Sequence, residues 1–320
     1  MTYTFRPAKR ENVSLLVGIA GGTGSGKTFS AMRLASGMAN GARFAVIDTE
    51  NGRARHYADQ FDFDYVDLRA PFRPDAYADA IDAAAKAGYP VIVVDSMSHE
   101  WDGDGGCLDW QEEEMERLGN REAMKMLSWQ QPKKSHRKMV TRLLQVNAHV
   151  ILCFRAQDKI EMVKEGGKTV VRPKRSLTGL DGWIPISEPR LPFELTLSVL
   201  MTADAPGVPK PIKLQDQHKA AVPLDRPITE QTGTALAAWA SGAGTPKAGA
   251  AEEAPTGPAA SAVITKEQQH ELVAAAQASG LDGSQARAII ERLTGQTSSA
   301  GIPADRFDEV LAEMSQAVLA

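Results

Sequence analysis

Apolar residues in the first 240 positions form short runs separated by stretches with helical spacing. Runs of this kind are typical of buried strands, and they lie at 15–20, 44–47, 91–94 and 150–154. Helical spacing follows the first run through Met32 and Met38 and recurs over 74–87, and a long helix-favouring stretch covers 108–145. Short strands alternating with helices predict a parallel sheet with crossover helices. We therefore expect an α/β fold with a mostly parallel sheet and flanking helices.

Further strand signals follow this alternating region. Residues 159–173 have the pattern of a hairpin that turns at Gly166-Gly167. Two more segments, 193–201 and 211–214, have strand composition. We expect these two segments to extend the sheet as antiparallel strands.

The composition changes abruptly after Trp239. Residues 241–262 are almost entirely Ala, Gly, Ser, Thr, Pro and Glu, which is typical of a flexible linker. Three helical patterns follow it; Thr265 and Gln268 form a capping box for the first, and Gly295 ends the second. The sequence therefore predicts three parts, namely a large domain over 1–240, a linker over 241–262 and a small helical module over 263–320.

A glycine-rich loop joins the first predicted strand to the first predicted helix. It fits the pattern G-x-x-x-x-G-K-[ST] and consists of Gly21, Gly22, Thr23, Gly24, Ser25, Gly26, Lys27 and Thr28. Backbone N–H groups of such a loop surround phosphates, and the helix N-terminus adds partial positive charge. Lys27 is expected to reach the β- and γ-phosphates of ATP, and the Thr28 hydroxyl is expected to ligate Mg²⁺.

Carboxylates follow two of the other predicted strands. Asp95 comes after four apolar residues, which is the place of an aspartate that holds Mg²⁺ through water. Hydrolysis also needs a carboxylate that orients the attacking water. Because Ser96 stands directly after Asp95, Glu50 at the end of the neighbouring strand is our first candidate for this role, and Glu100 is the second.

These strand ends resemble the RecA-type ATPase core. The resemblance rests on the loop together with Asp48-Thr-Glu50 and Asp95-Ser96, and it covers about residues 12–240. The chain is similar to RecA-like P-loop ATPases of phages and prophages, a group that includes the Sak-type single-strand annealing recombinases. The resemblance implies a RecA-like fold, a catalytic role for Glu50 and a metal-binding role for Asp95. It also places Arg155, with Gln157 two residues on, where a γ-phosphate sensor is expected.

Two basic stretches occupy the positions that carry DNA-binding loops in RecA-like proteins. Residues 121–142 and 155–175 are rich in Lys and Arg. The resemblance therefore implies binding of single-stranded DNA, whereas the simplest alternative is a pair of solvated faces. Trp129 has two interpretations as well, because a tryptophan in such a stretch can stack on a base or pack against the protein.

The net charge and the positions of the cysteines and histidines argue against several other functions. The net charge of −4 gives no general attraction to nucleic acid. Cys107 and Cys153 lack metal-ligand spacing, and the histidines are scattered, so we expect no disulfide, no structural zinc and no nucleophilic catalysis. The chain shows no signal peptide and no membrane-spanning run, which predicts a protein of the bacterial host cytoplasm that does not contact membranes.

Two functions are consistent with these patterns. The first is a Mg²⁺-dependent ATPase that acts on DNA in recombination or annealing, as a ring or filament and with a phage single-strand-binding protein as a possible partner. An acidic stretch over 102–116 could pair with the basic stretches of a neighbouring subunit. The second is a nucleotide-gated adaptor or loader that recruits a partner through its C-terminal helices. A small-molecule kinase fits less well, because the basic residues lack the spacing of a phosphate-covering lid.

Overall fold

The computed structural model describes residues 5, 7–166, 168–174, 182–242, 264–296, 298 and 301–316. The chain divides into two compact units, Met1–Ala250 and Ala251–Ala320, and each is described by itself. The predicted linker over 241–262 lies outside the described residues except for Ser241 and Gly242.

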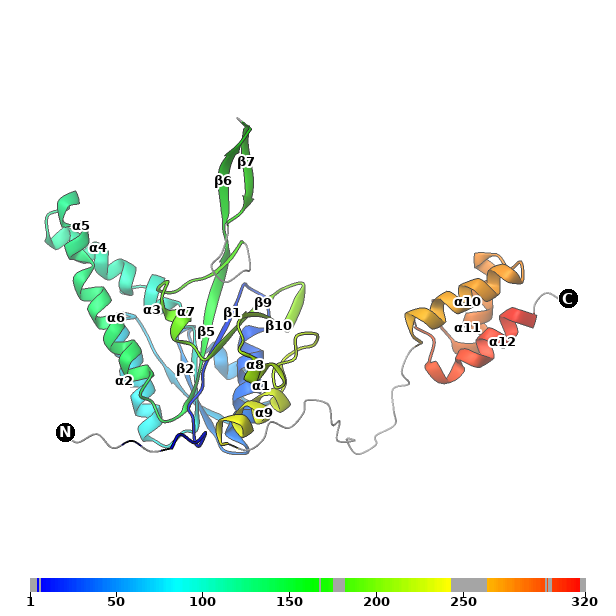
Figure 1. Ribbon diagram of the computed structural model, residues 1–320, viewed down its shortest axis with the longest axis horizontal. Coiled ribbons are helices and arrows are strands. Elements are labelled where there is room, and N and C mark those ends of the chain that lie inside the picture. The colour runs from blue at the N-terminus through cyan, green and yellow to red at the C-terminus, as the bar shows by residue number, and fades with distance from the viewer. Residues whose placement is uncertain are drawn as a thin grey trace. The chain divides into compact units, whose positions relative to one another are not determined.

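The first unit is built on one mixed sheet (Figure 1). Its strands run in the order β3–β2–β4–β5–β1–β9–β10, with β8 paired to β5. Every pair from β3 to β9 is parallel, whereas β10 and β8 are antiparallel to their neighbours. The bounds are β1 Leu16–Gly21, β2 Phe44–Asp48, β3 Phe63–Asp67, β4 Val91–Asp95, β5 His149–Asp158, β8 Trp183–Pro185, β9 Leu197–Thr202 and β10 Ala205–Lys213. The predicted α/β fold with a mostly parallel sheet is confirmed.

Helices cover both faces of this sheet, which explains why its central strands are continuous apolar runs. On one face, α1 (Lys27–Ala39) and α9 (Glu230–Ala240) pack on alternate strand residues such as Val91 and Val93. On the other, α2 (Pro74–Lys86) and α6 (Gln130–Leu143) pack on Ile92 and Val94. The shorter helices are α3 His99–Asp102, α4 Cys107–Arg117, α5 Lys125–Ser128, α7 Leu191–Glu194 and α8 Asp216–Lys219, and the 3₁₀ turns are η1 Arg53–Tyr57 and η2 Glu122–Met124.

The predicted hairpin is confirmed, but the predicted direction of one strand is wrong. Strands β6 (Ile160–Glu165) and β7 (Lys168–Pro173) pair in a two-stranded sheet that projects beyond the main sheet (Figure 1). Strand β10 is antiparallel as expected, but β9 is parallel to β1, and Phe193 lies in α7 rather than in a strand. After β5 the chain passes through the hairpin and α7 and returns to the end of the sheet at which the parallel strands begin. Strand β9 therefore runs in the same direction as β1.

The second unit is a three-helix module. It contains α10 (Lys266–Ala278), α11 (Gly283–Thr294) and α12 (Phe307–Gln316), with the short turn η4 (Ala304–Arg306) before α12. The predicted Thr265–Gln268 capping box is present, and Gly295 ends α11 with a φ of 70°. Its small core includes Ile264, Leu272, Ile290, Phe307 and Val310.

Among the described residues, no helix combines the length and the apolar character needed to cross a membrane.

Helices α1 and α9 approach each other through two glycines. A Cβ on Gly37 would lie 1.8 Å from the Glu230 carbonyl oxygen, and one on Gly233 would lie 2.2 Å from the Leu34 carbonyl oxygen. These contacts are with backbone, which cannot move aside as a flexible side chain does. The glycine-rich loop leads into α1, and its last two residues, Lys27 and Thr28, are the first two of the helix. The packing of α1 on α9 therefore fixes the position of both residues.

We therefore expect Gly37→Ala to destabilise the protein, although alanine favours helices over glycine by about 1 kcal/mol. The clash should cost about 1–3 kcal/mol or more, measured as the free energy of unfolding by urea. Gly283→Ala is the control, because its added methyl group would meet nothing within 4 Å among the described residues. Equal stability of the two variants would contradict the proposed close packing.

Candidate active site

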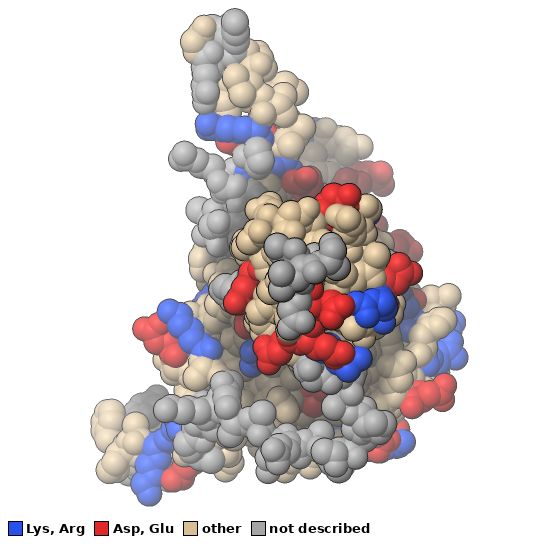
Figure 2. Space-filling model, turned by 90° about the vertical axis from the view of Figure 1, so that its right-hand side faces the viewer, with Lys and Arg blue, Asp and Glu red and all other residues tan. Residues whose placement is uncertain are grey.

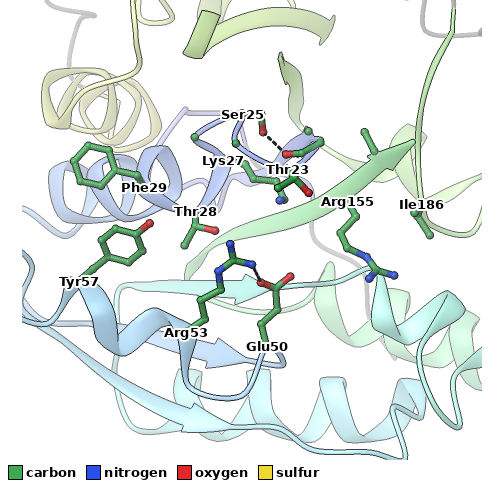
Figure 3. A pocket seen from close by; sticks show the side chains of 15 residues that line it. Thr23, Ser25, Lys27, Thr28, Phe29, Glu50, Arg53, Tyr57, Arg155 and Ile186 are labelled. Carbon is green, nitrogen blue, oxygen red and sulfur yellow. Dashed lines mark hydrogen bonds and ion pairs between the residues drawn. The ribbon is translucent and has the colours of Figure 1, made fainter. Parts of the chain in front are cut away.

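The glycine-rich loop curves around one side of a pocket of about 670 Å³ (Figure 3). Gly24 and Gly26 have backbone φ values of 74° and 79°, which residues with a Cβ atom rarely adopt. The buried Ser25 hydroxyl donates to the Gly22 carbonyl at 2.8 Å and holds the turn closed. The whole predicted loop, Gly21 to Thr28, lines the pocket, together with Phe29, Glu50, Arg53, Tyr57, Arg155, Ala156 and Ile186.

Thr28 and Asp95 meet at the base of the loop. The Thr28 hydroxyl donates to Asp95 Oδ2 at 2.6 Å, across the space between α1 and the end of β4. Asp95 is buried, and its second oxygen, Oδ1, has no hydrogen-bond partner among the described residues. Burial raises the pKa of Asp95 to about 6; the Thr28 hydrogen bond offsets part of this shift, and Glu50 adds to it. A buried carboxylate oxygen without a partner, beside a hydroxyl, is a donor set that suits Mg²⁺.

Hydrogen bonds tie the end of β2 to the end of β4. The Thr49 hydroxyl accepts from the Ser96 N–H at 2.7 Å, and the Thr49 N–H donates to the Asp95 carbonyl at 2.8 Å. The buried Asp48 carboxylate accepts from the N–H groups of Glu50 and Ala54. This network fixes the backbone on which Glu50 stands and keeps it beside Asp95.

Arg53 is a pocket residue that the sequence reasoning missed. Its Nη1 lies 2.7 Å from Glu50 Oε2, and both side chains face the pocket opposite Lys27 and Thr28 (Figure 3). The Glu50 side chain is only 16% exposed, whereas that of Arg53 is 62% exposed. The i,i+3 spacing of the two residues on the turn after β2 was the available signal.

Arg155 lies at the pocket as expected, within β5 and beside Gly21, but its guanidinium is already paired with a carboxylate. Its Nη2 lies 3.0 Å from both carboxylate oxygens of Asp102. Its backbone N–H donates to Ser98 Oγ, whose hydroxyl donates to the Ile186 carbonyl. Gln157 is exposed two residues further on and does not belong to the described lining of the pocket.

Glu100 occupies a different place from Glu50. It is 1% exposed, and its Oε1 lies 2.9 Å from His136 Nδ1 and 3.3 Å from Cys107 Sγ. It does not line the described pocket. The structure therefore brings the loop, Glu50, Asp95 and Arg155 together and separates Glu100 from them.

Phe29 and Tyr57 line another side of the pocket (Figure 3). Their ring centroids lie 5.8 Å apart, and Phe29 also packs on Phe61 at 5.7 Å. Loop, carboxylates, arginines and an aromatic wall together form the surroundings that a nucleoside triphosphate requires.

A protein-family model described as an AAA domain (AAA_24) matches residues 14–178, more than half of the chain. The chain belongs to this AAA-domain family. The match contains the glycine-rich loop, β2 with Glu50, β4 with Asp95 and β5 with Arg155, so the pocket is that of a nucleotide-binding P-loop ATPase. No curated protein shows a significant match to this AAA-domain chain.

Asp95→Asn should make the AAA-domain protein more stable at pH 8 in the absence of nucleotide and divalent cations. Because the folded-state pKa is raised, stability is greatest below the ordinary value of 3.8 and is lost as pH rises through about 6. The variant should therefore exceed wild type in free energy of unfolding by about 1–2 kcal/mol less at pH 5 than at pH 8. Urea unfolding with EDTA present measures this difference.

Asp59→Asn is the matched control for this experiment, because Asp59 is exposed. It should leave the pH dependence of unfolding unchanged. A gain for Asp95→Asn that stays constant from pH 5 to pH 8 would contradict the assigned pKa.

Proposed function

We propose that this P-loop ATPase hydrolyses ATP with Mg²⁺ and couples hydrolysis to single-stranded DNA. The observation that carries the proposal is the arrangement around the pocket, where the glycine-rich loop with Lys27 and Thr28 faces Glu50 (Figure 3). Asp95 lies behind this wall and accepts a hydrogen bond from Thr28. Thr28 and Asp95 Oδ1 are the groups that would hold Mg²⁺, directly and through water respectively. Bound Mg²⁺ would neutralise charge on the phosphate oxygens.

The side chains divide the work of hydrolysis among them. Loop N–H groups and Lys27 bind the β- and γ-phosphates and stabilise the charge that develops on them. The Glu50 carboxylate accepts a hydrogen bond from the attacking water and orients it in line with the γ-phosphate. Arg155, oriented by Asp102, lines the pocket from β5 and would contact the γ-phosphate.

The ion pair between Glu50 and Arg53 bears directly on this mechanism. A carboxylate that accepts from a guanidinium is a weaker acceptor for water. Because the Arg53 side chain is mostly exposed, a phosphate of the substrate can attract it away from Glu50 at little cost. Arg53 would then act as a positioning residue for Glu50.

Single-stranded DNA is proposed as the second ligand because α6 presents a row of cations. Four of its basic residues are exposed, namely Lys133, Lys134, Arg137 and Lys138, while Met139 and Leu143 pack against the sheet. Arg142, by contrast, is paired with Asp79 and Asp82. The face in Figure 2 shows both signs of charge interspersed among its described residues.

The second predicted basic stretch, 155–175, contributes less free charge. On the β6–β7 hairpin Arg172 pairs with Glu161 at 3.0 Å. Lys164 and Lys174 are exposed, whereas Lys159 is half-buried. Arg175 lies outside the described residues. Trp129 stacks on Trp101, with centroids 5.7 Å apart, and Lys133 lies over its ring, which favours the packed interpretation of this tryptophan.

The biological setting is proposed from the resemblance of residues 12–240. It supports recombination or single-strand annealing of phage DNA in the bacterial host cytoplasm, by a ring or filament of this chain. A phage single-strand-binding protein is a suitable partner for such an activity.

A nucleotide-gated adaptor is the second candidate. It is favoured by an apolar groove of about 440 Å³ on the C-terminal module, which is lined by Leu272, Val273, Ala276, Leu281, Ile290 and Met314 among others. Val273 is 51% exposed there, so an apolar segment of a partner could bind. Slow hydrolysis that does not respond to DNA would favour this function over the first.

Glu50→Gln should lower kcat for ATP hydrolysis by about 10²–10⁴-fold, because the carboxylate that orients water is lost. Nucleotide affinity should be nearly unchanged, whereas Lys27→Ala should weaken it. The measurements are phosphate release and fluorescent-nucleotide binding, each with and without single-stranded DNA. Glu194→Gln is the control, because this glutamate is exposed, lies outside both basic stretches and does not line the described pocket. Full activity of Glu50→Gln would remove Glu50 from the mechanism.

Reversal of Lys134, Arg137 and Lys138 to Glu should weaken DNA binding and reduce its dependence on salt. Each lost phosphate contact lowers the slope of log K against log salt by about 0.7 for single strands. Fluorescence anisotropy at several salt concentrations measures this slope. A control variant carries the same reversal at the exposed Lys86 and Lys219, which lie outside both basic stretches. Equal slopes for the two variants would argue against DNA contact through α6.

A further inference from the structure

A buried cluster of three different metal-ligating side chains lies outside the nucleotide pocket. Glu100 of α3, Cys107 at the start of α4 and His136 of α6 each offer one ligand atom, and these atoms lie within 4.8 Å of one another. The three residues are 1%, 1% and 5% exposed. They are separated by six and by twenty-eight positions in the sequence, so no local spacing reveals the site, and the expectation of no structural zinc rested on local spacing alone.

We propose that Glu100, Cys107 and His136 bind one zinc ion. Thiolate together with imidazole selects zinc among the common divalent ions, and a carboxylate completes a frequent ligand set. Distances of 2.9 Å from Glu100 Oε1 to His136 Nδ1 and of 3.3 Å from Glu100 Oε1 to Cys107 Sγ match ligands that share a metal at about 2.0–2.3 Å.

The charges in the cluster balance when zinc is bound. One Zn²⁺ neutralises the Glu100 carboxylate and the Cys107 thiolate, while His136 binds as neutral imidazole. The thiol proton leaves to solvent as the sulfur–metal bond forms, and a protonated His136 ring loses the proton on Nδ1 in the same way.

A second carboxylate lies near the other nitrogen of the imidazole. Glu188 Oε2 lies 4.0 Å from His136 Nε2, the ring nitrogen that faces away from Glu100. Metal-binding histidines generally direct their other nitrogen to a carboxylate, which fixes the ring and strengthens it as a ligand. Glu188 is itself held in place, because it accepts from the Arg190 N–H at 2.6 Å.

The zinc ion would join three helices that follow the nucleotide site. Glu100 stands five positions after Asp95, and His136 lies on α6 between the exposed cations Lys134 and Arg137. The ion would therefore fix α3, α4 and α6 to one another without contributing to phosphate chemistry.

The test is the metal content of the full-length, untagged protein after dialysis against zinc and then against metal-free buffer. About one equivalent of zinc per chain should remain, and Co²⁺ in its place should give a thiolate-to-cobalt band in the near-ultraviolet. Cys107→Ser should lose this band. Cys153→Ala, which removes the other buried cysteine, should keep it. Glu188→Gln should weaken metal affinity by about 10–100-fold.

Two results would overturn the proposal. One is that the wild-type protein retains no zinc and shows no thiolate–cobalt band. This measurement does not depend on whether any variant folds. The other is Cys107→Ser that binds as much zinc as wild type, since the three side chains would then form a hydrogen-bonded cluster only. Asp95→Asn should retain zinc, so failure of ATP hydrolysis and failure of zinc binding can be distinguished.

Discussion

Parallel strands covered on both faces leave only their ends open to solvent, and the proposed catalytic groups stand at one set of these ends. Gly21, Asp48 and Asp95 end strands β1, β2 and β4, and Arg155 lies within β5 in register with Gly21. Parallel pairing fixes the register of these strands. The Thr49–Ser96 contact then brings the β2 and β4 ends together. Most of the pocket geometry follows from this single constraint.

The features that the sequence predicted correctly depend on local spacing. The loop needs eight consecutive residues, and the buried strands are continuous apolar runs because helices pack on both faces. The direction of β9 could not be predicted, because it depends on how a long connection returns to the sheet. Edge strand β3 was missed since its pattern alternates polar residues, and Phe63 is held by stacking on Phe44. The cluster of Glu100, Cys107 and His136 depends on tertiary packing alone.

Buried charge is the common feature of the two proposed metal sites. At Asp95 burial raises the pKa, and the Thr28 hydroxyl and the charge of Lys27 offset only part of this shift, so a bound cation would stabilise the carboxylate further. Around His136, burial lowers the pKa, but the hydrogen bond and charge of Glu100 and the charge of Glu188 outweigh it and raise the pKa overall. The two glutamates thus favour the protonated form of His136 when no metal is bound.

The glycine contact between α1 and α9 has a mechanical consequence. Helix α1 begins with Lys27 and Thr28, and α9 ends at Ala240, directly before the chain continues towards the C-terminal helices. At Gly37 and Gly233 the backbones of the two helices are in direct contact, with no side chain between them that could move aside. A tilt of the phosphate-binding helix would therefore displace α9 and, with it, the point at which the chain leaves the ATPase unit.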